Sequence, residues 1–293
     1  MTSMSAANPR KPDRYGVVGY PIEHSKSPLI HRMFAAATGE SLSYDRHAVS
    51  PEAFTVFVRD FFESGGCGLN VTVPHKEHAA RLADELTPRA ARAGAVNTLI
   101  RLADGRIRGD NTDGAGLLAD LDRLGVPIRG QRLLILGAGG ATRGIVGPLM
   151  ERGPAEILIA NRSAERAYAL AAEAAHPDVT GCSYTVLNTS FASPAAAPFD
   201  LVLHATPLGL EGAVPDVTPR IIGPGTFAYD LGYGIPDTPF VRWAMQHGAR
   251  AAAQGIGMLV EQAAEAFFVW RNVRPDTAPV HRALAGSTAQ STI

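Results

Sequence analysis

Residues Arg132–Ala141 read RLLILGAGGA, and they carry the strongest structural signal in the chain. Leu133 to Leu136 form a continuous apolar run that stops at glycines, as expected for a strand buried on both faces. A strand, a glycine turn and then a helix form the setting of a dinucleotide-binding fingerprint, in which glycines let the backbone approach a pyrophosphate at the helix N-terminus. The candidate cofactor contacts in this turn are Gly137, Ala138, Gly139, Gly140 and Ala141.

The fingerprint departs from its general pattern at Thr142, which occupies the third glycine position. A glycine-rich turn without any ligand is the alternative interpretation. The next expected strand ends near Arg162, where an NAD-specific enzyme usually carries a carboxylate for the ribose 2′-hydroxyl. Arg162 and Arg166 stand there instead, one helical turn apart, and guanidinium groups suit a 2′-phosphate. NADP is therefore favoured over NAD, with two solvated surface arginines as the alternative.

Strand-like and helical patterns alternate on both sides of this stretch, which predicts an α/β fold with parallel sheets flanked by helices. The expected strands are 15–19, 43–49, 132–136, 156–160, 199–204 and 227–230, and the expected helices include 28–37, 52–63 and 113–125. We expect two domains with the active-site cleft between them. A substrate domain comprises 14–112 plus 256–293, and a Rossmann-type NADP-binding domain comprises 113–255.

A polar strand end precedes Lys76 in the string NVTVPHK. Strand alternation places Asn70 and Thr72 on one face. Pro74 suits the first position of a helix, which puts Lys76 in the first turn, where the helix dipole disfavours a cation. This wrong-sign placement indicates a lysine that exchanges a proton; an exposed surface lysine is the alternative.

Asp113 in GDNTDG begins another expected helix, and by itself it reads as an N-cap. Paired with a lysine, however, an ionised aspartate gives a charge-assisted pair that holds and relays a proton. We therefore take Lys76 and Asp113 as the candidate catalytic pair.

Four further polar residues are candidates for substrate binding. Ser25 and Ser27 precede Pro28, so one of them serves as an N-cap, and two hydroxyls beside a helix start suit a carboxylate. Asn97 lies in an apolar strand, and Gln262 lies on an apolar helical stripe. Buried amides need hydrogen-bond partners, which a polyhydroxylated ligand or a core network supplies.

In these residues the chain resembles the shikimate dehydrogenase family. The matching strings occur in family order and cover the chain from about Tyr15 to Pro279. They are HSKSP (24–28), NVTVP (70–74) with Lys76, GAVNT (94–98), GDNTDG (109–114), GAGGA (137–141), NR (161–162), ATPLG (205–209) and GMLVEQA (257–263).

The resemblance implies an NADP-dependent reduction of 3-dehydroshikimate to shikimate in aromatic amino-acid and chorismate biosynthesis. It implies that Ser25 and Ser27 bind the substrate carboxylate, with Tyr233 nearby. It also implies that the residues around the ring hydroxyls are Asn70, Thr72, Lys76, Asn97, Asp113 and Gln262. Asn161 and Thr206 belong to strings on the cofactor side, and the resemblance makes them cofactor-binding candidates.

Three positions depart from the family pattern: His204 replaces an asparagine, His75 an aromatic residue and Gln254 an acidic one. These departures leave nucleotide contacts open, and we assign no role to either histidine. A quinate or quinate/shikimate dehydrogenase is the nearest alternative function. A non-catalytic NADP-binding sensor is another, although a sensor has no need of a proton-transfer pair.

Composition narrows the class of partner. A net charge of −1 with 46% apolar residues gives no reason to expect nucleic acid or a membrane, so the expected partner is a small molecule. Cys67 and Cys182 form no CxxC pair, which predicts neither a disulfide framework nor a metal site. The first fourteen residues lack an apolar leader, so we expect a cytoplasmic protein, either a monomer or a homodimer. The polar segment Gly286–Thr292 predicts a frayed tail.

Overall fold

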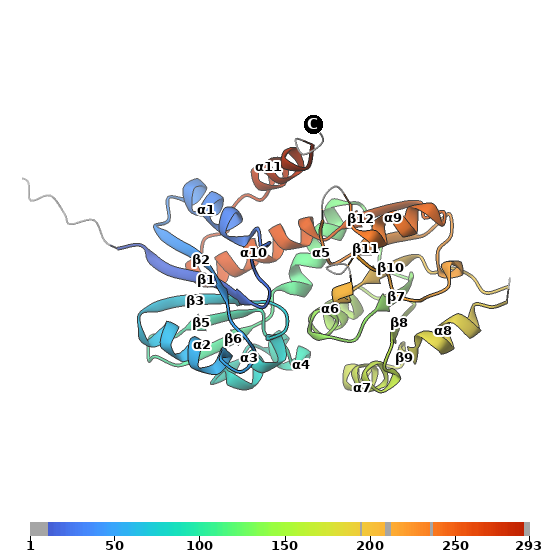
Figure 1. The fold of residues 1–293 in the computed structure, drawn as a ribbon, viewed down its shortest axis with the longest axis horizontal. Coiled ribbons are helices and arrows are strands. Elements are labelled where there is room, and N and C mark those ends of the chain that lie inside the picture. The colour runs from blue at the N-terminus through green and yellow to red at the C-terminus, as the bar shows by residue number, and fades with distance from the viewer. Residues whose placement is uncertain (1–10, 194, 209–211, 235–236, 290–293) are drawn as a thin grey trace, which may run out of the picture.

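The computed structural model describes residues 11–193, 195–208, 212–234 and 237–289, with side chains described as far as residue 285. Two six-stranded sheets form within these residues, one from β1 to β6 and one from β7 to β12. Figure 1 shows the two sheets side by side, each with helices against it, and helices α5 and α10 crossing between them. The predicted α/β fold class with two sheets is confirmed.

The first sheet has the strand order β2-β1-β3-β5-β6-β4. Its strands are β1 (Asp13–Gly19), β2 (Leu42–Ala48), β3 (Gly66–Val71), β4 (Glu85–Leu86), β5 (Thr98–Arg101) and β6 (Ile107–Asp110), and its helices are α1 (Ser27–Thr38), α2 (Phe54–Glu63), α3 (Lys76–Leu82) and α4 (Pro88–Ala93). The prediction of a purely parallel sheet is wrong here, because β5 runs antiparallel to both neighbours. For β5 and β6 the reason is their short connection, closed by a hydrogen bond from Leu102 N to Arg106 O (2.9 Å), which leaves no room for a crossover.

The second sheet is entirely parallel, in the order β12-β11-β10-β7-β8-β9. Its strands are β7 (Arg132–Leu136), β8 (Glu156–Asn161), β9 (Val179–Ser183), β10 (Leu201–His204), β11 (Phe227–Asp230) and β12 (Ala251–Gln254), accompanied by α6 (Gly140–Glu151), α7 (Ala164–Ala174), α8 (Tyr184–Ser190), the 3₁₀ turn η2 (Pro219–Ile221) and α9 (Pro239–Gln246). The chain reverses its direction of travel across the sheet between β7 and β10. Ligands of open α/β sheets bind beyond the carboxyl ends of strands at such a switch point.

Helices α5 (Asp113–Arg123) and α10 (Ile256–Arg271) connect the two halves. They approach closely because glycine stands at the crossing: a Cβ at Gly116 would lie 2.6 Å from the backbone N of Gln262. Leu117 and Leu121 of α5 pack into the core of the second sheet. Phe267 of α10 packs instead with Phe34 of α1. The site-bearing ends of both helices are thereby held between the sheets.

The predicted C-terminal tail is wrong in part, because helix α11 (Ala278–Ala289) continues through the first half of that segment. Val280 and Leu284 anchor this helix in the cluster formed by α1 and α10, and the polar residues follow as its last turn. Residues 290–293 lie outside the described part of the chain.

Candidate active site

A cavity of about 440 Å³ lies where the two halves meet, and its walls come from both sheets. Every predicted substrate-binding residue lines it: Ser25, Ser27, Asn70, Thr72, Lys76, Asn97, Asp113, Tyr233 and Gln262. The predicted cofactor residues divide into two groups. Gly139, Gly140, Ala141, Arg166 and Thr206 line the same cavity, whereas Gly137, Ala138, Asn161 and Arg162 are not among its lining residues.

Lys76 and Asp113 meet in this cavity. The Lys76 Nζ lies 2.6 Å from Oδ2 of Asp113, and the two side chains are 13% and 5% exposed. Asp113 is the first residue of α5, and its N-cap is Thr112, so the alternative of Asp113 as a simple N-cap is wrong. The lysine and the aspartate, which come from the starts of α3 and α5, therefore form a largely buried ion pair.

Lys76 lies in the first turn of α3 as predicted, although Pro74 is not part of that helix. Pro74 belongs instead to a turn in which His75 N donates to Thr72 O (2.9 Å). The lysine stem runs beside the glycine turn, because a Cβ added to Gly140 would lie 3.2 Å from the Cβ of Lys76. The ion pair is thus adjacent to the start of α6.

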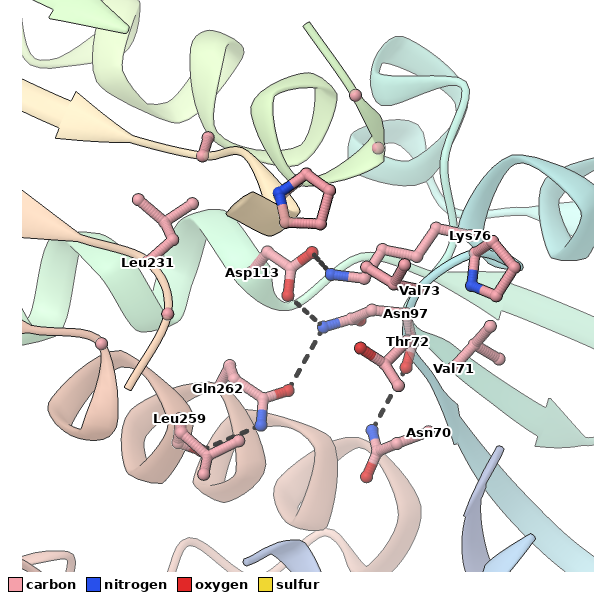
Figure 2. A pocket seen from close by; sticks show the side chains of 18 of the residues that line it. Asn70, Val71, Thr72, Val73, Lys76, Asn97, Asp113, Leu231, Leu259 and Gln262 are labelled. Carbon is pink, nitrogen blue, oxygen red and sulfur yellow. Dashed lines mark hydrogen bonds and ion pairs between the residues drawn. The ribbon is translucent and has the colours of Figure 1, made fainter. Parts of the chain in front are cut away.

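One buried amide, Asn97, holds the Asp113 carboxylate, and a second, Gln262, bonds to the first. Asn97 Nδ2 donates to Oδ1 of Asp113 (2.8 Å) and lies 3.3 Å from Oε1 of Gln262, whose own Nε2 donates to the carbonyl of Leu259 (2.9 Å). Figure 2 shows this chain running from Lys76 through Asp113 and Asn97 to Gln262. Asn97 immediately precedes β5 rather than lying inside it. The carboxylate therefore has one oxygen on the ammonium and one on an amide.

Ser25 and Ser27 are buried at the start of α1, with their hydroxyl oxygens 3.2 Å apart. The prediction that one of them is the N-cap is wrong, because Lys26 holds that position and makes no side-chain capping bond. The Ser25 hydroxyl accepts from Ser27 N (3.3 Å) and so closes a local turn. Both hydroxyls remain at the cavity wall, together with Tyr233, whose pKa is raised by burial so that it stays a neutral phenol.

Asn70 is oriented by a tyrosine that sequence reasoning missed. The Tyr44 hydroxyl donates to Oδ1 of Asn70 (2.7 Å), and Asn70 Nδ2 donates to Oγ1 of Thr98 (3.2 Å). Burial raises the pKa of Tyr44 well above its ordinary value, so it remains a donor. His31 stacks on this ring at 4.2 Å, and burial lowers its pKa to about 3. Tyr44 gave no signal in the sequence, because a core aromatic residue is common in a buried strand.

The glycine turn fits a dinucleotide pyrophosphate. Gly137 has φ +115°, and a Cβ there would lie 2.9 Å from Cγ2 of Thr206, so only glycine suits the position. Nothing lies within 4 Å of a Cβ added to Gly139, the N-cap of α6. A threonine at position 142, in place of the third glycine, has a structural role. Its hydroxyl donates to the Gly137 carbonyl (2.8 Å) and links the turn to the helix. The helix start is left open toward the cavity.

Arg162 and Arg166 both follow β8 and are exposed, and Arg166 also reaches the cavity wall. Neither forms a salt bridge within the described part of the chain. Asn161 ends β8 and donates from Nδ2 to the carbonyl of Ser163 (3.0 Å), which shapes the turn that carries Arg162; Arg166 lies in the first turn of α7. The two guanidinium groups are thus positioned at the strand end that reads the 2′ group in this fold.

Each of the three residues that depart from the family pattern has a hydrogen-bond partner in the structure. His75 lies 2.8 Å from the carbonyl of Val49 through Nε2 and stacks on Phe54, and burial lowers its pKa. Gln254 accepts at Oε1 from Gly234 N (2.7 Å). His204 lies between Thr206 and an aspartate. Gly209, the last residue of the ATPLG string, lies outside the described residues.

A parallel sheet with a glycine turn at its switch point, beside a buried lysine–aspartate pair on the wall of the same cavity, defines the class of dinucleotide-dependent dehydrogenases. Across residues 11–289, apart from the undescribed gaps, no cluster of side chains suits a metal ion. Nor is any helix in the described ranges long and apolar enough to cross a membrane.

Comparison with known proteins identifies the family. Three family profiles match: the shikimate dehydrogenase substrate binding domain (residues 17–99), the shikimate/quinate 5-dehydrogenase (121–207) and the shikimate 5′-dehydrogenase C-terminal domain (255–285). A shikimate dehydrogenase (NADP(+)) of Alkalilimnicola ehrlichii is 51% identical over 93% of this chain and 98% of that protein. The chain belongs to the shikimate dehydrogenase family.

Solved structures agree with this assignment. An Ael1 enzyme from Pseudomonas putida matches with 44% identity and a TM-score of 0.82, over 93% of this chain and 98% of that one. The shikimate 5-dehydrogenase of Thermus thermophilus, solved in complex with NADP(H) and shikimate, matches with 33% identity and a TM-score of 0.80, over 94% of this chain and 99% of that one.

Proposed function

We propose that this protein is a shikimate dehydrogenase, which reduces 3-dehydroshikimate to shikimate reversibly with NADPH. The observation that carries the proposal is the Lys76–Asp113 pair, 2.6 Å apart on the wall of a cavity that also receives the glycine turn. The identities of the substrate and the cofactor are inferred from the relatives named above. The pathway that follows is the biosynthesis of chorismate and aromatic amino acids.

Bound NADPH supplies the hydride that the carbonyl carbon receives. Lys76 donates a proton from Nζ to the carbonyl oxygen, which removes the negative charge that would otherwise develop there. Asp113 holds the ammonium by its Oδ2 contact and relays the replacement proton. Asn97 fixes the other carboxylate oxygen, so the pair keeps its geometry through the reaction. In the oxidation direction the same groups take the proton from the ring hydroxyl.

The remaining cavity residues bind and orient the substrate in this proposal. Ser25, Ser27 and Tyr233 present hydroxyl groups, which suit the substrate carboxylate because each is a neutral donor. Asn70, Thr72 and Gln262 face the ring hydroxyls with Lys76, Asn97 and Asp113. The hydrogen bond from Tyr44 supports this role, since it leaves the Asn70 amide in one fixed orientation.

The cofactor side follows from the strand ends of the second sheet. Gly137, Ala138, Gly139, Gly140 and Ala141 would hold the pyrophosphate at the start of α6. Arg162, in the turn shaped by Asn161, and Arg166, in the first turn of α7, would hold the 2′-phosphate. Thr206 would face the half of the dinucleotide that enters the cavity. These residues fit NADP because the glycine turn is open and β8 ends at Asn161 and is followed by Arg162, where an NAD-specific site would carry a carboxylate.

We also propose that 14–112 with 256–293 form the substrate domain and that 113–255 form the nucleotide domain. The packing of α10 against α1 supports a discontinuous first domain. Cys67 and Cys182 are free thiols, which suits a reducing compartment such as the cytoplasm. A monomer or a homodimer remains the expected assembly.

An activity measurement tests the proposed function. NADP⁺ reduction, followed by absorbance, is expected to be fastest with shikimate and much slower with quinate, because an additional ring hydroxyl needs a partner in a cavity already lined by paired groups. NAD⁺ is expected to be the weaker oxidant with either acid. Faster turnover of quinate with NAD⁺ than of shikimate with NADP⁺ would contradict the assignment.

A further inference from the structure

His204 forms a buried hydrogen-bonded chain with two neighbours on the cofactor side. Its Nδ1 lies 3.0 Å from Oδ1 of Asp230, and its Nε2 lies 2.6 Å from Oγ1 of Thr206. His204 and Asp230 are paired across β10 and β11 and are 0% and 1% exposed. The chain therefore runs from a buried carboxylate to a hydroxyl that lines the active-site cavity.

Hydrogen-bond chemistry gives this chain a direction. An ionised carboxylate only accepts, so the proton of a neutral His204 lies on Nδ1 and is donated to Asp230. Nε2 is then an acceptor and takes the hydroxyl proton of Thr206. Thr206 has no second proton to donate, so its oxygen can only accept further hydrogen bonds; it accepts one from Leu208 N (3.4 Å), and the residue lines the cavity.

Thr206 stands at the switch point of the second sheet. It follows β10, the strand beside β7, and its Cγ2 lies 2.9 Å from the position of a Cβ built on Gly137. The glycine turn and the Arg162 loop lie at β7 and β8, where the pyrophosphate and the adenosine half of a dinucleotide belong. Thr206 is on the other side of β7, where the nicotinamide half belongs.

Asp230 links the same chain to the substrate side. Its Oδ1 also accepts from Gly232 N (2.9 Å), and the loop that follows carries Tyr233. Gln254 holds that loop a second time at Gly234 N. A single carboxylate oxygen thus fixes both the histidine that orients Thr206 and the loop that places Tyr233.

We propose that His204 is a positioning residue for the cofactor. Held by Asp230, it presents the Thr206 oxygen as an acceptor for a donor group on the nicotinamide half, either a ribose hydroxyl or the carboxamide N–H. The inference rests on the proposed binding of NADP(H). It assigns a role to a residue that departs from the asparagine usual in the family, and it predicts that an amide side chain substitutes for the imidazole because it also carries one donor and one acceptor.

A double-mutant cycle on NADPH affinity tests this inference, with dissociation constants from fluorescence titration. Thr206→Val and His204→Phe are each expected to weaken NADPH binding about five-fold, the value of one hydrogen bond. The double variant is expected to bind no more weakly than Thr206→Val alone, because His204 acts through the hydroxyl. His204→Asn is expected to stay within about two-fold of the wild type.

Losses that multiply in the double variant would overturn the inference, as would unchanged affinity in a folded His204→Phe protein. If His204→Phe fails to fold, ¹⁵N NMR of the histidine-labelled wild type decides: a proton on Nδ1 of neutral His204 supports the inference, and a proton on Nε2 overturns it. Failure of the wild type to bind NADPH at all would count against the proposed function itself. If the wild type binds NADPH but the fold-changes of the two single variants multiply in the double variant, only the proposed role of His204 is contradicted, and the proposed function stands.

Discussion

Lys76→Ala is expected to lower kcat for shikimate oxidation by roughly two to four orders of magnitude while leaving the Kd of NADPH nearly unchanged. The physical reason is that the substitution removes the ammonium that lies 2.6 Å from Asp113. The glycine turn, Arg162 and Arg166 stay in place to bind the cofactor. Steady-state kinetics with NADP⁺ give kcat, and fluorescence titration gives the Kd. This combination separates chemistry from cofactor binding.

Lys11→Ala is the matched control, since Lys11 is an exposed lysine that precedes β1 and does not line the cavity, and it should behave as the wild type. Asp113→Asn should also be slow, and combining it with Lys76→Ala should add little, because the two residues act as one unit. A loss below about ten-fold in Lys76→Ala would remove the lysine from proton transfer. The interpretation of the protein as an NADP-binding sensor would be favoured only if the wild type bound NADPH and showed no turnover.

The double substitution Arg162→Ala with Arg166→Ala is expected to raise the KM for NADPH by about 30- to 100-fold, on the basis of two charge-assisted hydrogen bonds in a screened, exposed setting. The KM for NADH should change by no more than about two-fold, because NADH has no 2′-phosphate for the guanidinium forks to hold. Initial rates with each cofactor at saturating 3-dehydroshikimate provide the measurement.

A double substitution of two other exposed arginines, Arg59→Ala with Arg101→Ala, controls for the loss of positive charge, and both KM values should stay at wild-type levels. Equal changes for NADPH and NADH in the Arg162/Arg166 variant would contradict recognition of the phosphate. An unchanged KM for NADPH would place the 2′ group elsewhere.

The four inner strands of the second sheet, β7, β8, β10 and β11, were predictable from sequence because they carry strong local signals, whereas the edge strands β9 and β12 were not predicted. The apolar run before Gly137 and the glycine turn after it predict a buried parallel strand without reference to the rest of the chain. The first sheet was harder, since the direction of β5 depends on a short turn around Gly105 rather than on strand composition. Periodicity gives the face of a strand but not the direction of its neighbour.

The candidate site was predicted residue by residue, but its supporting contacts were not. Lys76 and Asp113 were singled out because both are charged residues near expected helix starts. A helix start favours the aspartate but disfavours the lysine, so helix preferences alone do not explain both. Tyr44 and His204 were missed as supports because their partners, Asn70 and Asp230, lie 26 positions away in each case. Such contacts depend on how strands pair, and this pairing is set by tertiary packing rather than by local sequence.

The prediction of serine N-caps failed for a related reason. Ser25 and Ser27 were assigned by the ordinary preference for hydroxyl residues at helix starts. In the structure the two hydroxyls bond locally and face the cavity, while Lys26 takes the cap position without a side-chain bond. A local preference was overridden where the side chains line a binding cavity, which is where such rules most often fail.

A crystal structure of the protein with shikimate and NADP⁺ is the most direct test of the central claim, that Lys76 and Asp113 meet the reacting hydroxyl beside the cofactor. We expect that hydroxyl to lie within about 3 Å of both Lys76 Nζ and an Asp113 carboxylate oxygen. We also expect the ring carbon that bears the hydroxyl to lie within about 3.5 Å of the nicotinamide ring. A complex with the substrate carboxylate against Lys76 and the hydroxyl turned toward Ser25 and Ser27 would contradict it.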